Sequence, residues 1–383
     1  MPSRRLLVIP ADPLYKYYEK GEIKARYWNP CGLFDEVHIL SLAPRDIAAE
    51  KVQVLVGDAH LQVHAIGKPS MWTLPLYYAR VRSLVRQIGP DLIRAHGPWH
   101  TGSLAVHAGR ALDIPTLVSV HSDRDAQRRH EPSLLLHMVR PLERYTLSNA
   151  SAVICVSDYL HDYARRHGAK RTYTVYNKVY CEGFAREKTH RREGPLKILS
   201  VMRLDRAKFP ECLIEAIAPL DAHLKLIGQG ELEEALRQQV SRLGLQERVE
   251  FVRQVPNCEI HAHYQEADVF AMATHYEGFC IPVLEAMAAG LPVVASSTGP
   301  IPEVLSGTGW IVDKQPAAFT RALGDLARDP ARRKAMGTAA RQRALVVDGM
   351  RMEERESHLY QVVMERRLGE FESMLTDSER FVN

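Results

Sequence analysis

The sequence predicts an α/β fold made of two doubly wound, Rossmann-like domains. Short apolar runs alternate with amphipathic segments in both halves of the chain, which is typical of parallel sheets covered by helices. The length of 383 residues favours more than one domain, and 46% hydrophobic with 25% charged residues is an ordinary globular balance. We expect the two domains to face each other across a cleft at the carboxyl ends of their strands, where ligands bind.

The first domain is predicted over residues 1–183. Its strands are expected to be short continuous apolar runs, and its helices longer segments with apolar residues every three or four positions. The expected strands are Leu6–Pro10, Val37–Leu40, Leu61–Ile66, Leu92–Ala95, Thr116–Val120 and Ala152–Val156. The expected helices are Leu74–Ile88, Ser103–Leu112 and Leu134–Leu147.

A second domain is predicted over residues 196–350, after a polar, non-periodic linker at 184–195. Its expected strands are Lys197–Val201, His223–Ile227, Val249–Val252, Val269–Met272, Pro292–Ala295 and Gly309–Val312. Its expected helices are Phe209–Ala218, Leu232–Leu243 and Pro282–Ala289. A charged helix with an apolar stripe follows, and we expect its residues 351–369 to cross back onto the first domain.

Composition excludes several classes of protein. The six cysteines are scattered without close pairs, which argues against a disulfide framework or a zinc site and fits a reducing compartment. No apolar span approaches 20 residues, so we expect a cytoplasmic protein. Residues 1–186 carry a net charge of +8, against −4 for the remainder. This basic half could contact a phosphate-bearing acceptor or the cytoplasmic face of a membrane, or it could be an ordinary solvated surface. No dense Lys/Arg block indicates nucleic-acid binding.

The most informative motif is a pair of glutamates eight positions apart, Glu277 and Glu285. Pro282 suits the first position of a helix and Gly290 suits its left-handed end, so Glu285 should lie inside a short helix. The start of such a helix directs free N–H groups at an anion. Carboxylates on both sides of an anion site fit the hydroxyl groups and phosphates of a nucleotide-sugar. Alternatively, Glu285 is a first-turn residue favoured by the helix dipole and Glu277 a solvated loop charge.

Two cations follow the first strand of the second domain. Arg203 and Lys208 come directly after the strand that ends at Val201. At the carboxyl end of a strand, two such side chains can neutralise a diphosphate. Taken alone, this segment could equally be an ordinary basic loop.

These motifs, in this order, resemble the family 4 retaining glycosyltransferases, which have the two-domain GT-B fold. The segments that carry the resemblance are Ile93–His96, Thr116–His121, Ala152–Ser157, Thr174–Asn177, the Arg-x4-Lys loop, Leu224–Gly230, Arg248–Phe251 and the Glu-x7-Glu motif. The resemblance covers nearly the whole chain, and it is strongest from 198 to 305.

The resemblance implies a role for each matching residue. Arg203 and Lys208 would bind the donor diphosphate and stabilise the leaving group. Glu277 would bind hydroxyls of the donor sugar, and Glu285 those of the ribose. His121 would stand close to the donor sugar. Further donor contacts are implied for Val255 at the base and for the backbone of Gly278, Phe279, Cys280 and Ile281. On the acceptor side the candidates are His96, Lys16 and Arg124, the last with Arg128 and Arg129 as a basic edge.

Three departures from the family pattern stand out. The first strand is followed by Pro10–Lys16 rather than by a glycine-rich loop, and Lys16 or Lys20 could take over that role. The turn before the linker is Asn177-Lys-Val-Tyr180 rather than the usual Asn-Gly-Val-Asp. Cys280 stands where the family often has glycine, and we expect its side chain to face the donor sugar and to alter sugar choice.

No metal or other cofactor is expected. Asp123-Arg-Asp125 has the form of a motif that can hold a metal on a diphosphate, but it lies in the first domain, away from Arg203 and Lys208.

The sequence thus predicts a retaining, metal-independent hexosyltransferase. It would move a sugar from a UDP- or GDP-linked donor to a hydroxyl of a glycan, lipid-linked or small-molecule acceptor, as in polysaccharide or lipopolysaccharide biosynthesis. The alternatives are a nucleotide-sugar epimerase or hydrolase on the same fold, and a nucleotide-sugar-binding subunit without catalysis. A dehydrogenase is excluded because no GxGxxG follows an expected strand.

Overall fold

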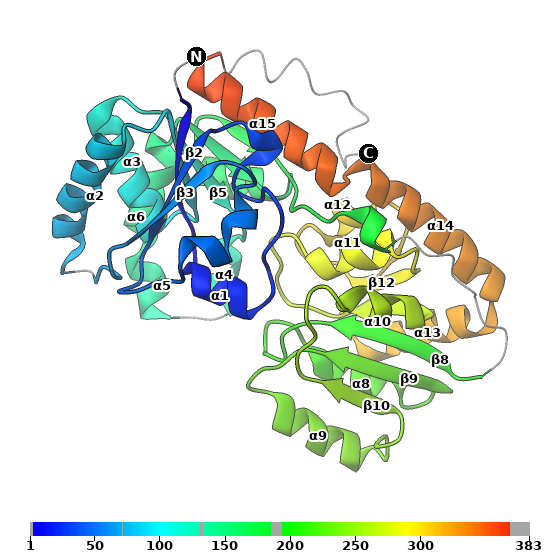
Figure 1. Ribbon diagram of the computed structural model, residues 1–383. Helices are drawn as coiled ribbons and strands as arrows, with labels where there is room; N and C mark the ends of the chain where they lie inside the picture. Colours follow the sequence, from blue (N-terminus) through cyan, green and yellow to red (C-terminus); the bar gives the residue numbers. More distant parts are fainter. Residues whose placement is uncertain (1–2, 71, 131–132, 185–193, 368–383) are drawn as a thin grey trace. The chain divides into compact units, whose positions relative to one another are not determined.

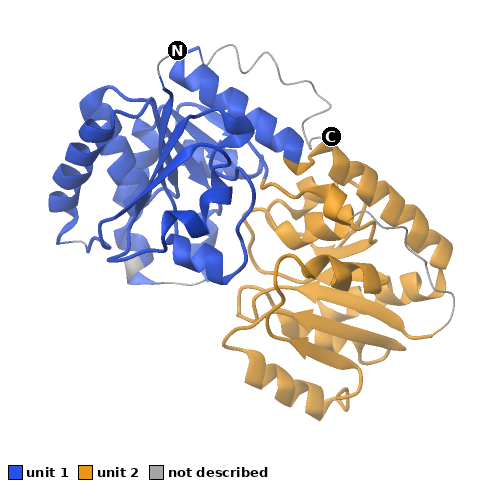
Figure 2. Ribbon diagram, in the orientation of Figure 1, with its two compact units in different colours: residues 1–176, 350–376 blue, residues 177–349, 377–383 orange. Residues whose placement is uncertain are grey.

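Two parallel sheets organise the chain, each in a unit of its own (Figures 1 and 2). The computed structural model describes residues 3–70, 72–130, 133–184 and 194–367. Unit 1 holds the chain up to Tyr176 together with the C-terminal helix from Met350, and unit 2 holds Asn177–Gly349. Both units are doubly wound α/β sheets, which confirms the predicted fold class.

The sheet of unit 1 has the strand order β3-β2-β1-β4-β5-β6-β7, and its neighbouring strands run parallel. The strands are β1 (Arg5–Ile9), β2 (Glu36–Ser41), β3 (His60–Ala65), β4 (Leu92–His96), β5 (Thr116–Val120), β6 (Ala152–Cys155) and β7 (Thr172–Thr174). The order reverses between β1 and β4, and a doubly wound sheet binds its ligands beyond the carboxyl ends of strands at such a reversal.

Helices cover both faces of this sheet, and α3 packs on β4 and β5 between α2 and α6. The helices are α1 (Leu14–Glu19), α2 (Leu74–Ile88), α3 (His100–Leu112), α4 (Arg124–His130), α5 (Leu134–Met138), α6 (Arg140–Asn149), α7 (Leu160–Arg166) and α15 (Gly349–Met364). The single helix predicted over Leu134–Leu147 is wrong. Pro141 has no N–H to donate to the preceding turn, so α5 ends and α6 begins around Val139.

The sheet of unit 2 repeats the pattern with the order β10-β9-β8-β11-β12-β13, again parallel. The strands are β8 (Leu196–Val201), β9 (Ala222–Ile227), β10 (Val249–Val252), β11 (Val269–Met272), β12 (Val293–Ser296) and β13 (Trp310–Val312). Here the order reverses between β8 and β11. The loops after these two strands therefore share one edge of the sheet.

The helices of unit 2 are α8 (Pro210–Ile217), α9 (Glu233–Arg242), α10 (Ile260–Glu266), α11 (Ile281–Ala288), α12 (Ile301–Leu305), α13 (Pro316–Arg328) and α14 (Pro330–Val346). Helix α11 begins one residue before Pro282, which occupies one of its first two positions. Gly290 has a φ of 71°, the left-handed conformation that the sequence predicts at the end of this helix.

The division between the units differs slightly from the predicted boundary at residue 183. The short helix Cys181–Phe184 packs on α10 and α11, so the chain joins unit 2 already at Asn177. Of the predicted linker 184–195, residues 185–193 lie outside the described residues. Among the described residues, no helix is long and apolar enough to cross a membrane.

Buried polar contacts hold α15 in unit 1. The Arg94 guanidinium, from β4, donates to the Tyr360 hydroxyl at 2.9 Å and to the Glu356 carboxylate at 3.4 Å. Glu353 accepts from the Cys31 backbone N–H at 2.9 Å. Because Arg94 and Glu356 are both nearly fully buried, their pairing ties α15 to the centre of the sheet.

Candidate functional site

The loop after β8 carries Arg203 and Lys208, and two glycines let it pack closely on the loop after β9. A Cβ atom on Gly228 would lie 1.8 Å from the carbonyl oxygen of Met202, and one on Gly230 would lie 2.2 Å from that of Leu204. No side chain fits at either position. The Gly-Gln-Gly sequence thus shapes the backbone on both sides of Arg203.

The loop after β11 is fastened to this first loop. Ala207 accepts two hydrogen bonds at its carbonyl oxygen, from the His275 N–H at 2.8 Å and from the Thr274 hydroxyl at 3.0 Å. The rings of Phe209 and His275 stack with centroids 4.7 Å apart. The two loops of the β8–β11 reversal therefore form one connected surface.

Lys208 and Glu277 meet where these loops join. The Lys208 ammonium forms an ion pair and hydrogen bond with Glu277, and the two side chains are 15% and 8% exposed. Arg203 lies on the same loop but is not drawn into this pair, because it contacts Asp205 at 3.1 Å and remains 69% exposed. Of the four charged residues predicted for the donor site, the structure thus brings Lys208 and Glu277 into contact and leaves Arg203 accessible.

Glu285 lies on α11, beyond the loop that carries Gly278 and Phe279. Its carboxylate accepts a hydrogen bond at 2.8 Å from the hydroxyl of Tyr264, which extends from α10 and is fully buried. Glu277 and Glu285 therefore have different partners, a charged ammonium for the first and a neutral phenol for the second.

Cys280 immediately precedes α11 and has a left-handed backbone, with φ 70° and ψ 67°. Glycine adopts this conformation without steric cost, which is a physical reason for a preference for glycine there. The side chain is only 5% exposed and its sulfur lies 3.0 Å from that of Met272. The prediction that this side chain faces a donor sugar is wrong, since it points into the core against β11.

Val255, the predicted contact for a base, lies half-buried on the loop after β10, and the backbone of Ile281 opens α11. Their donor contacts stay predictions.

In unit 1, His121 directly follows β5 and His96 ends β4. Their rings stack with centroids 5.8 Å apart, and the Nε2 atom of His121 lies 2.8 Å from the Ser119 hydroxyl. Although His121 keeps an exposed side, desolvation by the surrounding protein and then the charges of Arg94 and Arg124 lower the pKa of its imidazole. His121 is therefore neutral at pH 7.

The segment after β1, where the resemblance predicts a glycine-rich loop, forms the short helix α1. The backbone N–H groups of Leu14 and Tyr15 both donate to the Asp46 carboxylate at 2.8 Å. Lys16, predicted as an acceptor contact, pairs with Asp12 at 3.3 Å and is about half exposed. The start of α1 is thus already neutralised by a carboxylate of the chain itself.

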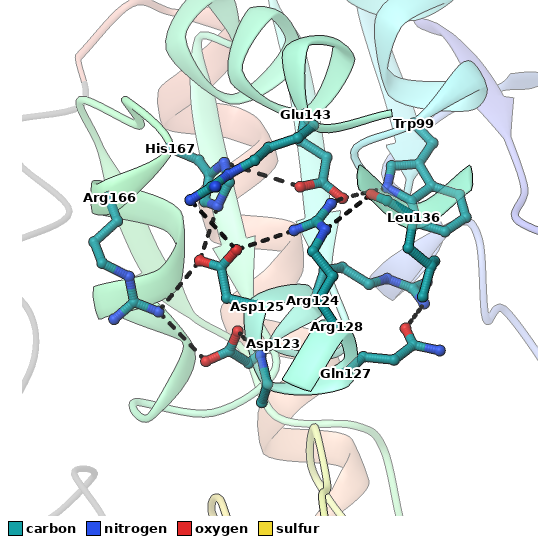
Figure 3. A network of polar contacts seen from close by, with 12 residues as sticks. Trp99, Asp123, Arg124, Asp125, Gln127, Arg128, Leu136, Glu143, Arg166 and His167 are labelled. Atoms are coloured by element: carbon teal, nitrogen blue, oxygen red, sulfur yellow. Dashed lines mark hydrogen bonds and ion pairs between the residues drawn. The ribbon is translucent and has the colours of Figure 1, made fainter. Parts of the chain in front are cut away.

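The Asp123-Arg-Asp125 segment belongs to an ion-pair network whose inner members, Asp125, Arg128, Glu143 and His167, are at most 14% exposed (Figure 3). Asp125 accepts from Arg128 at 3.0 Å and contacts the ring of the buried His167 at 3.1 Å. Arg128 also donates at 2.7 Å to Glu143, which is fully buried. The expectation that Arg128 forms part of an acceptor-facing edge is therefore wrong, because its guanidinium is satisfied inside the unit.

Arg124 takes a different position from Arg128. Its guanidinium lies over the Trp99 ring, 4.4 Å from the centroid, and donates to Gln127 at 2.6 Å (Figure 3). It is half-buried, and its acceptor contact stays a prediction. Arg129 is exposed.

Two residues that position predicted site segments were not predicted from the sequence. Tyr264 lies 21 positions before Glu285 and on a different helix, so no local spacing connects them. Asp46 is likewise 32 positions from the amide group of Leu14 that it binds. A satisfied carboxylate leaves no pattern in sequence when its partner comes from another element.

Comparison with known proteins decides the family. A model described as glycosyl transferases group 1 matches residues 182–343, and a model of a glycosyl transferase 4-like domain matches residues 25–178. The chain belongs to the GT-B glycosyltransferases of the family 4 type. The two matched segments cover most of unit 2 and most of unit 1 in turn.

Relatives of this chain include two named enzymes. The GDP-mannose-dependent alpha-(1-6)-phosphatidylinositol monomannoside mannosyltransferase of Mycolicibacterium smegmatis is 40% identical over 185 residues, which is 44% of this chain and 48% of the relative. The chain thus spans about half the length of that relative. A glycogen synthase of Mycobacterium tuberculosis is 25% identical over 319 residues, covering 78% of this chain and 77% of the relative.

Solved structures share the fold of the glycosyltransferase. Sucrose-phosphate synthase from Thermosynechococcus elongatus superposes with a TM-score of 0.75 at 20% identity, covering 95% of this chain and all of that one. HepE from Anabaena, in complex with UDP, gives a TM-score of 0.75 at 19% identity, covering 93% of this chain and 99% of that one. At such identities the likeness establishes the GT-B fold alone.

Proposed function

We propose that this glycosyltransferase moves a sugar from a UDP- or GDP-linked donor to a hydroxyl group of a glycan, lipid-linked or small-molecule acceptor, with retention of configuration and without a metal. The observation that carries the proposal is the Lys208–Glu277 pair on the joined loops of the β8–β11 reversal. A cation and a carboxylate at this edge fit the two halves of a donor, its diphosphate and its sugar hydroxyls.

Arg203 and Lys208 would bind the diphosphate. Arg203 is exposed and can reach a ligand, and a donor phosphate would compete with Glu277 for the Lys208 ammonium. Both cations would then face the oxygen atoms on which negative charge develops as the sugar–phosphate bond breaks. Such preorganised charge is usually the largest single contribution to catalysis.

The same exchange would release Glu277. Once Lys208 binds phosphate, the Glu277 carboxylate is free to accept hydrogen bonds from hydroxyls of the transferred sugar. Glu285, one helix turn into α11, would accept from the ribose hydroxyls, and the N–H groups of Phe279, Cys280 and Ile281 would meet sugar or phosphate oxygens at the start of this helix.

Retention would follow from attack on the front face of the sugar. The acceptor oxygen would form a bond to the anomeric carbon while the bond to the diphosphate oxygen breaks, and the leaving phosphate would take the proton of the acceptor hydroxyl. His121, neutral at pH 7, would hold geometry near the donor sugar rather than supply a charge. The GDP-mannose-dependent relative and the UDP complex of HepE support a nucleotide-sugar donor without deciding its base.

We expect this reaction on the cytoplasmic side, with basic unit 1 as the surface that could contact an anionic acceptor or membrane.

A donor screen followed by calorimetry tests the proposal. Thermal-shift measurements with UDP, GDP and ADP should identify one ligand, since a ligand at 100 times its Kd stabilises by about 2.7 kcal/mol. With that nucleoside diphosphate, Glu285→Ala should weaken binding strongly, whereas Glu277→Ala should chiefly lower turnover. Equal losses of binding in both variants would refute the division of roles.

Product analysis separates transfer from the alternatives. A transferase retains the sugar in a new glycoside whose anomeric configuration matches that of the donor, which NMR can assign. Release of free sugar as the sole product, or conversion of the nucleotide-sugar to an epimer, would overturn the proposal.

A further inference from the structure

A buried phenol holds the carboxylate that we assign to the ribose. The Tyr264 hydroxyl lies 2.8 Å from Oε2 of Glu285 and 3.4 Å from the carbonyl oxygen of Pro282 in the first turn of α11. The tyrosine comes from α10, so one hydroxyl connects α10 to both the beginning and the second turn of α11.

The position of this phenol is fixed by aromatic packing. The Tyr264 ring meets Phe184 edge-on, with centroids 5.7 Å apart, and stacks on Phe270 of β11 at 5.9 Å. The residue is fully buried. A ring packed in this way cannot turn its hydroxyl elsewhere without disrupting the core.

The phenol is also a permanent donor. Burial first, and then the negative charge of Glu285, raise the pKa of Tyr264 well above its ordinary value. The hydroxyl therefore keeps its proton over the working pH range and donates a hydrogen bond to the carboxylate. A hydrogen bond to an ionised acceptor is stronger and more directional than one between neutral groups.

We propose that Tyr264 is the positioning residue that orients Glu285 toward the ribose of the donor, and thereby sets the preference for ribonucleotides over 2′- and 3′-deoxyribonucleotides. The inference rests on the proposed function of Glu285. An ionised carboxylate has about four acceptor sites on two oxygen atoms, so a bond from Tyr264 is compatible with acceptance of hydrogen bonds from ribose hydroxyls. With one oxygen fixed, the plane of the carboxylate is fixed as well. Both ribose hydroxyls can then bind without a further loss of side-chain freedom.

The test measures discrimination between sugars of the nucleotide rather than affinity alone. Whichever of UDP and GDP binds the unmodified protein is titrated calorimetrically, together with its 2′-deoxy and 3′-deoxy forms. In Tyr264→Phe the Kd of the ribonucleotide should rise about tenfold, corresponding to about 1.4 kcal/mol. The Kd values of the deoxy forms should rise much less, because part of what Tyr264 supports is already missing from them.

A purely structural role would give a different result. If Tyr264 merely supports packing, Tyr264→Phe raises the Kd values of the ribonucleotide and of the deoxyribonucleotides by the same factor. That result would overturn the inference. Tyr163→Phe is the matched control, because it removes the hydroxyl of another fully buried tyrosine, on α7 in unit 1, and should leave all of these Kd values unchanged.

Glu285→Ala distinguishes failure of the inference from failure of the proposed function. If Glu285→Ala abolishes ribose discrimination while Tyr264→Phe retains it in full, only the role of Tyr264 is refuted. If Glu285→Ala leaves discrimination intact, the ribose assignment itself fails. Should Tyr264→Phe not fold, Phe184→Leu removes the edge-on ring contact and should cause a smaller loss of discrimination in the same direction. Unchanged discrimination in Phe184→Leu would then overturn the inference.

Discussion

Two charged clusters, one in each unit, contain similar residues but differ in burial and in the number of charged partners. In unit 1, Asp125, Arg128, Glu143 and His167 form a network in which each charged group has a charged partner and Glu143 is fully buried (Figure 3). In unit 2, Lys208 and Glu277 form one pair at the edge of the sheet, on a loop that also presents the exposed Arg203. The four side chains of the first cluster, here called the closed network, are at most 14% exposed, whereas the second cluster includes a guanidinium that is 69% exposed and that a ligand can reach.

Burial and the number of partners distinguish charged groups that stabilise the fold from charged groups that can bind a ligand. Asp123-Arg-Asp125 has the form of a functional motif, yet its carboxylates are used by Arg128, Arg166 and His167. A ligand would have to replace several partners at once in unit 1, whereas a donor phosphate needs to displace only Glu277 from Lys208. We therefore expect substitutions in the first cluster to act on stability and substitutions in the second to act on turnover.

The largest expected effect is on stability, from Glu143→Ala. Removing this carboxylate leaves the buried Arg128 guanidinium with half of its charge compensation and takes away the acceptor of the Trp99 N–H. Breaking a buried ion pair typically costs about 3–5 kcal/mol. Denaturant unfolding should show this loss, whereas Asp12→Asn, at the exposed pair with Lys16, should cost about 1 kcal/mol or less. Equal losses would remove the distinction between closed and exposed pairs.

Lys208→Ala should act on turnover instead. Losing one preorganised charge at the leaving group is expected to reduce kcat by a factor of about 10²–10³, which corresponds to about 2.7–4 kcal/mol. Steady-state kinetics with the identified donor measures this effect, and circular dichroism should show an intact fold. Lys225→Ala is the control, because this lysine of β9 pairs with Glu250 of β10 at 3.4 Å, outside the proposed site. Near-normal turnover in Lys208→Ala would contradict the role of the pair.

A smaller effect is expected on stability at low pH, from Asp125 in the closed network. Burial would raise the pKa of Asp125, but the hydrogen bond and charge of His167, followed by Arg140 and Arg128, outweigh it and lower the pKa. The stability from this ionised carboxylate is complete above the unfolded-state pKa of about 3.9 and is lost as the pH falls through the lower folded-state value. Asp125→Asn should therefore flatten the fall in unfolding free energy below about pH 4. An unchanged slope would mean that Asp125 does not contribute.

The smallest effect is expected at Cys280. In Cys280→Gly, relief of a left-handed backbone, about 1–2 kcal/mol, offsets the loss of the buried sulfur contact with Met272. The free energy of unfolding should change by about 1 kcal/mol or less. Because the sulfur points into the core, the relative rates with different donor sugars should stay the same. A changed sugar preference, measured by competing donors, would show that the side chain does reach the ligand.

Much of the fold could be predicted because its signals are local. The buried strands are continuous apolar runs, and Gly290 ends α11 in the left-handed conformation that glycine favours. The break between α5 and α6 could have been predicted too, since Pro141 lies within the expected helix. The boundary at Tyr176 could not, because it depends on the packing of Cys181–Phe184 against α10 and α11.

For the site, the order of residues along the chain specifies which side chains follow the strands at the point where the sheet order reverses. Because β8 ends just before Arg203 and Lys208, both residues lie at the carboxyl edge of the sheet, independently of how other elements pack. Which of these charges are paired and which remain accessible depends on how the elements pack in three dimensions. Lys208 meets Glu277 across 69 positions, and Tyr264 meets Glu285 across 21. Such contacts depend on where whole elements pack, so no spacing within one element encodes them.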